Sequence, residues 1–132
     1  MIYVIGESLG GGIGYTSSHR MADLLGVERA TFMRNVVWIN LYDQPGCEPG
    51  AYIDMIDRAS TPDDAIVLLG KKVAKEYGVD TLGPLASVRR HGGMGSTVVA
   101  FPHPSGLNRW WNRTDHVTMA TETLQRIWKE HQ

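Results

Sequence analysis

The chain has little cysteine and no excess of charge of either sign. One cysteine, Cys47, stands among its 132 residues, which excludes an intramolecular disulfide, a zinc site with four cysteine ligands and the usual cysteine-ligated iron–sulfur cluster. Thirteen basic residues face fourteen acidic ones, so the net charge of −1 argues against a protein that coats nucleic acid by charge alone. We therefore expect chemistry that uses no metal and no other cofactor.

Long apolar runs are missing as well. No segment reaches the roughly 20 apolar residues that a membrane-spanning helix needs. The first residues, "MIYVIG", lead directly into a strand-like segment, without the charged leader of a secretory signal. With 42% apolar residues the chain can still bury a core, so we expect one cytoplasmic domain over residues 1–132 that has no membrane partner.

Apolar runs and helical patterns alternate along the chain. Four runs rich in β-forming residues occur at residues 2–5, 36–41, 66–69 and 97–101. They are continuous, which is typical of strands buried on both faces of a parallel sheet. Helical patterns occur at residues 17–25, 52–59, 71–77 and 116–130, and residues 82–95 are expected to form a glycine-rich loop. This order predicts a three-layer α/β domain.

The segments that follow the four strands carry the unusual residues. In open parallel sheets, ligands bind beyond the carboxyl ends of the strands, and right-handed crossovers place every post-strand segment at that edge. We therefore expect one site to be built from "GESLGGGIGY", "NLYDQPG", "GKK" and "PHPSGLNRWW".

The segment after the first strand, "GESLGGGIGY", combines glycines with a carboxylate. Its glycines allow the backbone to approach a ligand closely and to direct N–H groups at an anion. It is not the dinucleotide-binding fingerprint, because Tyr15 stands where that pattern needs its last glycine. Glu7 stands where a general base or a water-orienting group would lie, although a solvated surface carboxylate is the alternative.

Two polar residues stand at the ends of apolar strands. Asn40 lies inside the run "VVWINLY" and offers a donor and an acceptor on one amide, although the neighbouring backbone could equally satisfy it. His103 lies between two prolines that fix its backbone, and rigid placement matters more to a ligand than to solvent.

Other polar and aromatic residues near these segments have two explanations each. Lys71 opens a helix, an unfavourable end for a cation unless an anion lies near, but it also suits a solvated surface. The cluster Arg89, Arg90 and His91 is either a phosphate clamp or solvated. We expect at least one of the adjacent tryptophans, Trp110 and Trp111, to cover the core.

These segments together resemble a known family. "HPSGLNR" resembles the second signature motif of the uracil-DNA glycosylase superfamily, and "IGESLGGGIGYTSSHRMADLL" is similar to its first motif. "NVVWINLYDQPG" and "VLLGKKVAKEYG" resemble its middle segments, so the similarity covers nearly the whole chain in the right order. The resemblance implies a compact three-layer α/β/α domain with a four-stranded parallel sheet in the order 2-1-3-4.

It also implies a monofunctional DNA glycosylase that flips uracil, or a 5-substituted uracil, out of DNA and hydrolyses its N-glycosidic bond. Glu7 would orient or deprotonate the attacking water, and His103 would donate a hydrogen bond to the base as negative charge develops on it. Tyr15 would stack on the base, Asn40 would pair with its Watson–Crick edge, and Gly6 would line the base site.

The resemblance also implies that DNA is the partner, contacted by a second group of residues. It implies further that the protein acts as a monomer. Leu107 would enter the base stack with the help of Arg109. The residues expected to contact DNA are Ser105, Gly106, Leu107, Asn108, Arg109 and Lys71.

Two alternatives stay open at this point. An enzyme acting on a free pyrimidine deoxynucleotide would explain the neutral charge and the glycine-rich loop, but it would not need the Leu107 wedge. A non-catalytic DNA-binding relative would keep "HPSG" and could lose Glu7.

Overall fold

The computed structural model describes residues 1–7, 15–43, 46, 48–78, 87–91, 96–103 and 109–131. The strands in these residues are β1 (Ile2–Gly6), β2 (Val37–Asn40), β3 (Ala65–Leu69), β4 (Ser87–His91) and β5 (Ser96–Phe101). The α-helices are α1 (Tyr15–Leu25), α2 (Arg29–Arg34), α3 (Pro49–Ala59), α4 (Lys71–Glu76) and α5 (Thr114–His131). Two 3₁₀ turns follow strand ends, η1 (Leu41–Asp43) and η2 (Arg109–Asn112).

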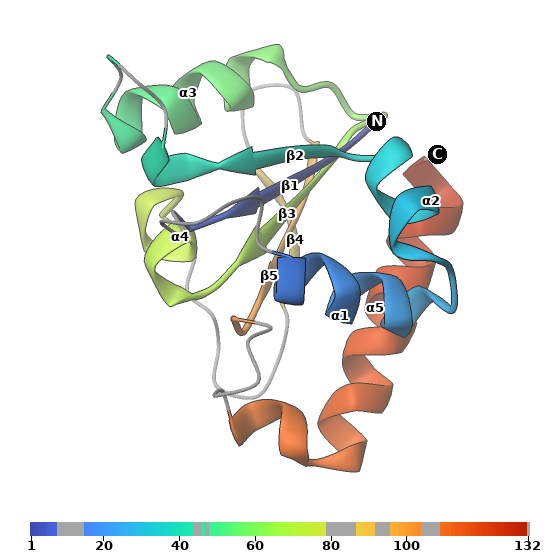
Figure 1. The fold of residues 1–132 in the computed structure, drawn as a ribbon. Helices are drawn as coiled ribbons and strands as arrows, with labels where there is room; N and C mark the ends of the chain where they lie inside the picture. Colours follow the sequence, from blue (N-terminus) through green and yellow to red (C-terminus); the bar gives the residue numbers. More distant parts are fainter. Residues whose placement is uncertain are drawn as a thin grey trace.

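The strands form one sheet in the order β2-β1-β3-β5-β4. Its first four members pair in parallel, which confirms the predicted parallel sheet in the order 2-1-3-4 with the run at residues 97–101 as its fourth strand. Helices lie on both sides of this sheet, so the three-layer α/β/α architecture is confirmed (Figure 1).

The fifth strand, β4, corrects the expectation of a loop over residues 82–95. It pairs antiparallel with β5, with Ser87 opposite Ala100 and His91 opposite Ser96. An edge strand is held by backbone hydrogen bonds on one side only, so the polar sequence "SVRRH" forms it without an apolar run that would reveal it. The short helix α2 is a further element that the sequence pattern does not predict. The residue before it, Glu28, is not one of the preferred N-cap residues and makes no side-chain cap in the structure.

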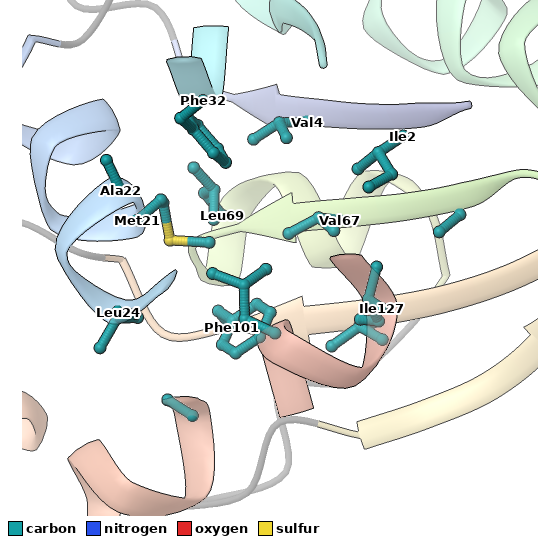
Figure 2. Packing of buried hydrophobic residues seen from close by; sticks show 14 of the residues in the cluster. Ile2, Val4, Met21, Ala22, Leu24, Phe32, Val67, Leu69, Phe101 and Ile127 are labelled. Carbon is teal, nitrogen blue, oxygen red and sulfur yellow. The ribbon is translucent and has the colours of Figure 1, made fainter. Parts of the chain in front are cut away.

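The sheet carries a separate apolar layer on each face, because successive side chains of a strand point to opposite sides. On one face Val4, Val67, Leu69 and Phe101 pack under helices α1, α2 and α5, as Figure 2 shows. On the other face Ile5, Ile66 and Leu68 pack under α3 and α4. All residues of β3 are buried, as the continuous apolar run predicted.

The helices follow their predicted patterns with ends displaced by a few residues. Helix α5 buries Ala120, Leu124 and Ile127 against the sheet. Gly26 and Gly78 have φ angles of 70° and 78° and follow the ends of α1 and α4, where a glycine tolerates the left-handed turn. Among the helices that the structure describes, none has the length and apolar character needed to cross a membrane.

The turn before β3 is held by a carboxylate. Asp64 accepts hydrogen bonds from the backbone N–H and the hydroxyl of Thr61 at 2.9 and 3.3 Å, and it pairs with the Met1 amino group at 3.1 Å. Burial acts to raise the pKa of Asp64, but the hydrogen bonds from Thr61 and the amino group outweigh it and hold this pKa below its ordinary value. Asp64 thereby fixes the point at which β3 begins.

Replacing this carboxylate should make folding less sensitive to acid. Because the folded-state pKa of Asp64 is lowered, its stabilisation is complete above the ordinary carboxyl pKa and is lost as the pH falls through the lowered value. We expect Asp64→Asn to cost about 1 kcal/mol in the free energy of unfolding at pH 7 and less at pH 3. Urea unfolding at both pH values measures this, with Asp63→Asn as the exposed control. A cost that does not change with pH would contradict it.

Candidate active site

The described residues that follow the parallel strands lie at one edge of the sheet, as the sequence predicted. Gly6 and Asn40 end β1 and β2 and are directly paired in the strand register. Glu7 follows β1, Lys71 follows β3 after Gly70, and His103 lies two residues beyond β5. Parallel pairing therefore brings the carboxylate, the amide and the imidazole to the same edge.

Gly70 is the point at which the two predicted catalytic side chains come together. Its N–H donates to the Phe101 carbonyl at 2.9 Å, which aligns the ends of β3 and β5. A Cβ atom added at Gly70 would lie 3.2 Å from Cδ2 of His103 and 3.4 Å from Oε1 of Glu7. Both side chains are half-buried, so the carboxylate and the imidazole pack against the same piece of backbone.

The Asn40 amide is oriented by a tryptophan of the same strand. The indole N–H of Trp38 donates to Oδ1 of Asn40 at 3.0 Å. Indole can only donate, so Oδ1 faces Trp38 and Nδ2 lies on the other side of the amide. Residues two apart on a strand share a face, and this spacing is the signal from which the contact could have been inferred.

Gly6 keeps the neighbouring position on β1 small. A Cβ atom at Gly6 would lie 3.6 Å from Cζ2 of Trp38 and 3.8 Å from Oδ1 of Asn40. These are ordinary contact distances, so a side chain there would cover the amide. Because residue 6 is glycine, no side chain at this position of β1 covers the Asn40 amide.

The backbone of His103 is attached to the helical layer. Its carbonyl accepts a hydrogen bond from the indole N–H of Trp111 at 2.9 Å. Trp111 is 4% exposed and belongs to the core cluster, which confirms that at least one of the two tryptophans covers the core. The hydrogen bond to His103 is a role that the adjacent tryptophans did not reveal in the sequence.

Tyr42 interacts electrostatically with Glu7, and the sequence did not single it out. Partial burial raises the pKa of Tyr42 above its ordinary value, and the negative charges of Glu76 and Glu7 raise it further. A surface hollow of about 550 Å³ lies beside it, and its walls are Tyr42, Lys72, Lys75 and Glu76. The hollow lies between η1 and α4, which both follow strand ends at the site edge.

The remaining predicted residues fall into two groups. Lys71 begins α4 and Arg109 begins η2, and both are exposed. Tyr15 begins α1, but its side chain lies outside the described residues, as do those of Arg89, Arg90 and His91 in β4. The predictions for Ser105, Gly106, Leu107 and Asn108 also fall outside the described part of the chain.

The described side chains offer acid–base and hydrogen-bonding chemistry. Among them, no group of three or more histidine, cysteine, aspartate or glutamate residues is arranged to hold a metal ion. No model of a known protein family matches the chain, and no curated protein matches it either.

The space over Gly70 can be tested by filling it. Gly70 has φ and ψ angles of 99° and 158°, a conformation that essentially only glycine adopts, so Gly70→Ala combines backbone strain of about 1–3 kcal/mol with contacts on His103 and Glu7. Gly78→Ala is the control, because its φ of 78° also strains an added side chain while no atom lies within 4 Å of the added Cβ.

We expect Gly70→Ala to lower the free energy of unfolding by about 1 kcal/mol or more beyond the loss in Gly78→Ala, because its backbone conformation excludes a side chain and its Cβ also crowds His103 and Glu7. We also expect it to shift the NMR signals of the His103 imidazole, which Gly78→Ala should leave in place. Equal losses of stability together with unshifted imidazole signals would show that His103 does not pack on Gly70.

Proposed function

We propose that the protein is a DNA glycosylase that hydrolyses the N-glycosidic bond of uracil, or of a 5-substituted uracil, in a nucleotide flipped out of DNA. The observation that carries the proposal is the packing of the Glu7 carboxylate and the His103 imidazole against Gly70. Asn40 ends a strand at the same edge and supplies the third group that such a reaction needs.

His103 provides for the leaving group. When the bond between C1′ of the sugar and N1 of the base breaks, the electron pair leaves with the base, which becomes an anion. An imidazole N–H directed at the base O2 stabilises that charge as it develops. The hydrogen bond from Trp111 to the His103 carbonyl supports a fixed position for this donor.

Glu7 provides for the attacking water. The water oxygen forms the new bond to C1′, and the carboxylate takes the proton that the water loses. The negative charge of Glu7 also favours the cationic character that the sugar acquires as the base departs. Its position beside His103 allows the two groups to serve opposite sides of the same bond.

Asn40 provides for base selection. Nδ2 can donate to the uracil O4, and the second lone pair of Oδ1 can accept from N3–H while the first is used by Trp38. Cytosine presents an amine where uracil presents O4 and an acceptor where uracil presents N3–H. The amide orientation set by Trp38 therefore matches uracil and opposes cytosine.

DNA contacts complete the proposal. Arg109 and Lys71 are exposed at the site edge, where they can approach phosphates. Leu107 is proposed as the wedge that fills the space left in the duplex. Ser105, Gly106 and Asn108 are proposed to contact the DNA beside it. Tyr15 begins α1 directly after the first loop and is proposed to stack on the base. We further propose that the protein acts as a monomer in the cytoplasm.

Base release from a single-stranded oligonucleotide that contains uracil tests the function. Alkali cleaves the strand at each abasic site, so strand breaks report hydrolysis. We expect His103→Ala, Asn40→Ala and Glu7→Gln each to lower turnover by about 100-fold or more, because each removes a preorganised group. Glu122→Gln and Asn35→Ala, exposed residues of the same types on other parts of the surface, should retain full activity.

Other outcomes of the same experiment would change the assignment. Release of uracil from free dUMP but none from DNA would indicate an enzyme of free nucleotides. Tight binding of DNA with no release from any substrate would indicate a non-catalytic binding protein.

Trp38→Phe tests how the base is selected. Phenylalanine fills much of the same space but lacks the indole N–H, so the Asn40 amide loses the donor that faces Oδ1. We expect activity on uracil to fall roughly 5-fold, since one hydrogen bond is worth about 1 kcal/mol, and discrimination against cytosine to weaken. Initial rates on oligonucleotides with uracil or cytosine at one position measure both. Unchanged discrimination would show that Trp38 does not orient the amide.

A further inference from the structure

We infer that Trp111 is a positioning residue that holds the His103 imidazole where it can donate to the substrate base. The inference deepens the proposed glycosylase function and rests on it. Its basis is the hydrogen bond from the Trp111 indole to the His103 carbonyl at 2.9 Å, which connects the end of β5 to the helical layer.

The two prolines limit how the backbone beside His103 can bond to the sheet. Strand β5 ends at Phe101, and the next residues are Pro102, His103 and Pro104. Neither proline has an N–H, so neither can donate a backbone hydrogen bond to the sheet. The indole N–H supplies a donor to this segment from another element, η2.

The indole is itself held firmly in place. Trp111 is 4% exposed, and Trp110 meets it edge-to-face with ring centroids 4.7 Å apart. Trp110 stacks on His116 of α5 at 4.5 Å, and Nδ1 of His116 lies 2.8 Å from the Trp110 carbonyl. The guanidinium of Arg20 on α1 lies 5.2 Å from the Trp111 ring centroid. Packing between α1 and α5 therefore holds the indole that donates to the His103 carbonyl.

Positioning of this kind affects turnover more than binding. A donor displaced by about 1 Å from a developing charge can cost on the order of 100-fold in rate, whereas the ground-state complex changes little. A residue that only fills the core would instead lower stability and leave kcat unchanged in the folded protein.

Trp111→Phe separates the two roles, because it keeps an aromatic ring and removes the N–H. Trp128→Phe is the matched control, since Trp128 stacks on Phe32 at 5.9 Å in the same apolar cluster and lies on α5 away from His103. We expect Trp111→Phe to lower kcat on the uracil oligonucleotide by about 10- to 100-fold with KM within about 2-fold. Trp128→Phe should change neither constant.

A double variant shows whether the effect passes through His103. In a His103→Ala background, Trp111→Phe should cause no further loss of kcat, because the group that it positions is absent. Losses that multiply in the double variant, or an unchanged kcat in Trp111→Phe alone, would overturn the inference.

A failure of the proposed function would be recognised separately. If the wild-type protein releases no base from any substrate, the glycosylase proposal fails, and the positioning is then judged by NMR. The His103 imidazole signals, assigned with His103→Gln, should shift in Trp111→Phe and stay in place in Trp128→Phe.

Hydrogen exchange in the wild-type protein gives a further test, which does not depend on whether a variant folds. The Trp111 indole N–H should exchange with solvent slowly, because it is buried and hydrogen-bonded. Rapid exchange of this proton, or imidazole signals that do not move in Trp111→Phe, would overturn the role assigned to Trp111.

Discussion

The approach of two polar side chains over a glycine is the constraint on which the site depends. Gly70 directly follows the third strand in a conformation with positive φ, and its missing side chain leaves room for Glu7, which follows β1, and for His103, which lies beyond β5. The hydrogen bond from Gly70 to Phe101 aligns the ends of β3 and β5. A carboxylate and an imidazole are thereby brought together without a direct sequence motif that contains both.

Two polar groups of the candidate site are each held by a tryptophan indole. The Asn40 amide is oriented by an indole on its own strand, and the His103 backbone is attached to an indole from η2. Both indoles act as donors only, so each fixes the acceptor it meets. The tryptophans of this small domain thus orient polar groups in addition to providing apolar surface for the core.

A three-layer α/β sheet supports many chemistries, so the fold does not determine the reaction. What favours the proposed base excision is the combination at one edge of a carboxylate that can activate water, an imidazole that can donate to an anionic leaving group and an amide that Trp38 contacts. The surface hollow between η1 and α4 adds the phenol of Tyr42 and the amino groups of Lys72 and Lys75.

The sequence by itself determined the parallel strands, because continuous apolar runs such as residues 65–69 are buried whichever partners they choose. It also placed Glu7, Asn40 and His103 at strand ends, since that follows from local pattern and the geometry of parallel crossovers. Tertiary structure alone decided the edge strand β4, which depends on the backbone of β5, and the hydrogen bond from Trp111 to the His103 carbonyl. The two-residue spacing of Trp38 and Asn40 already places them on one strand face, whereas the Trp111 contact depends on how η2 packs beside the residues after β5, which residue type and spacing along the chain do not encode.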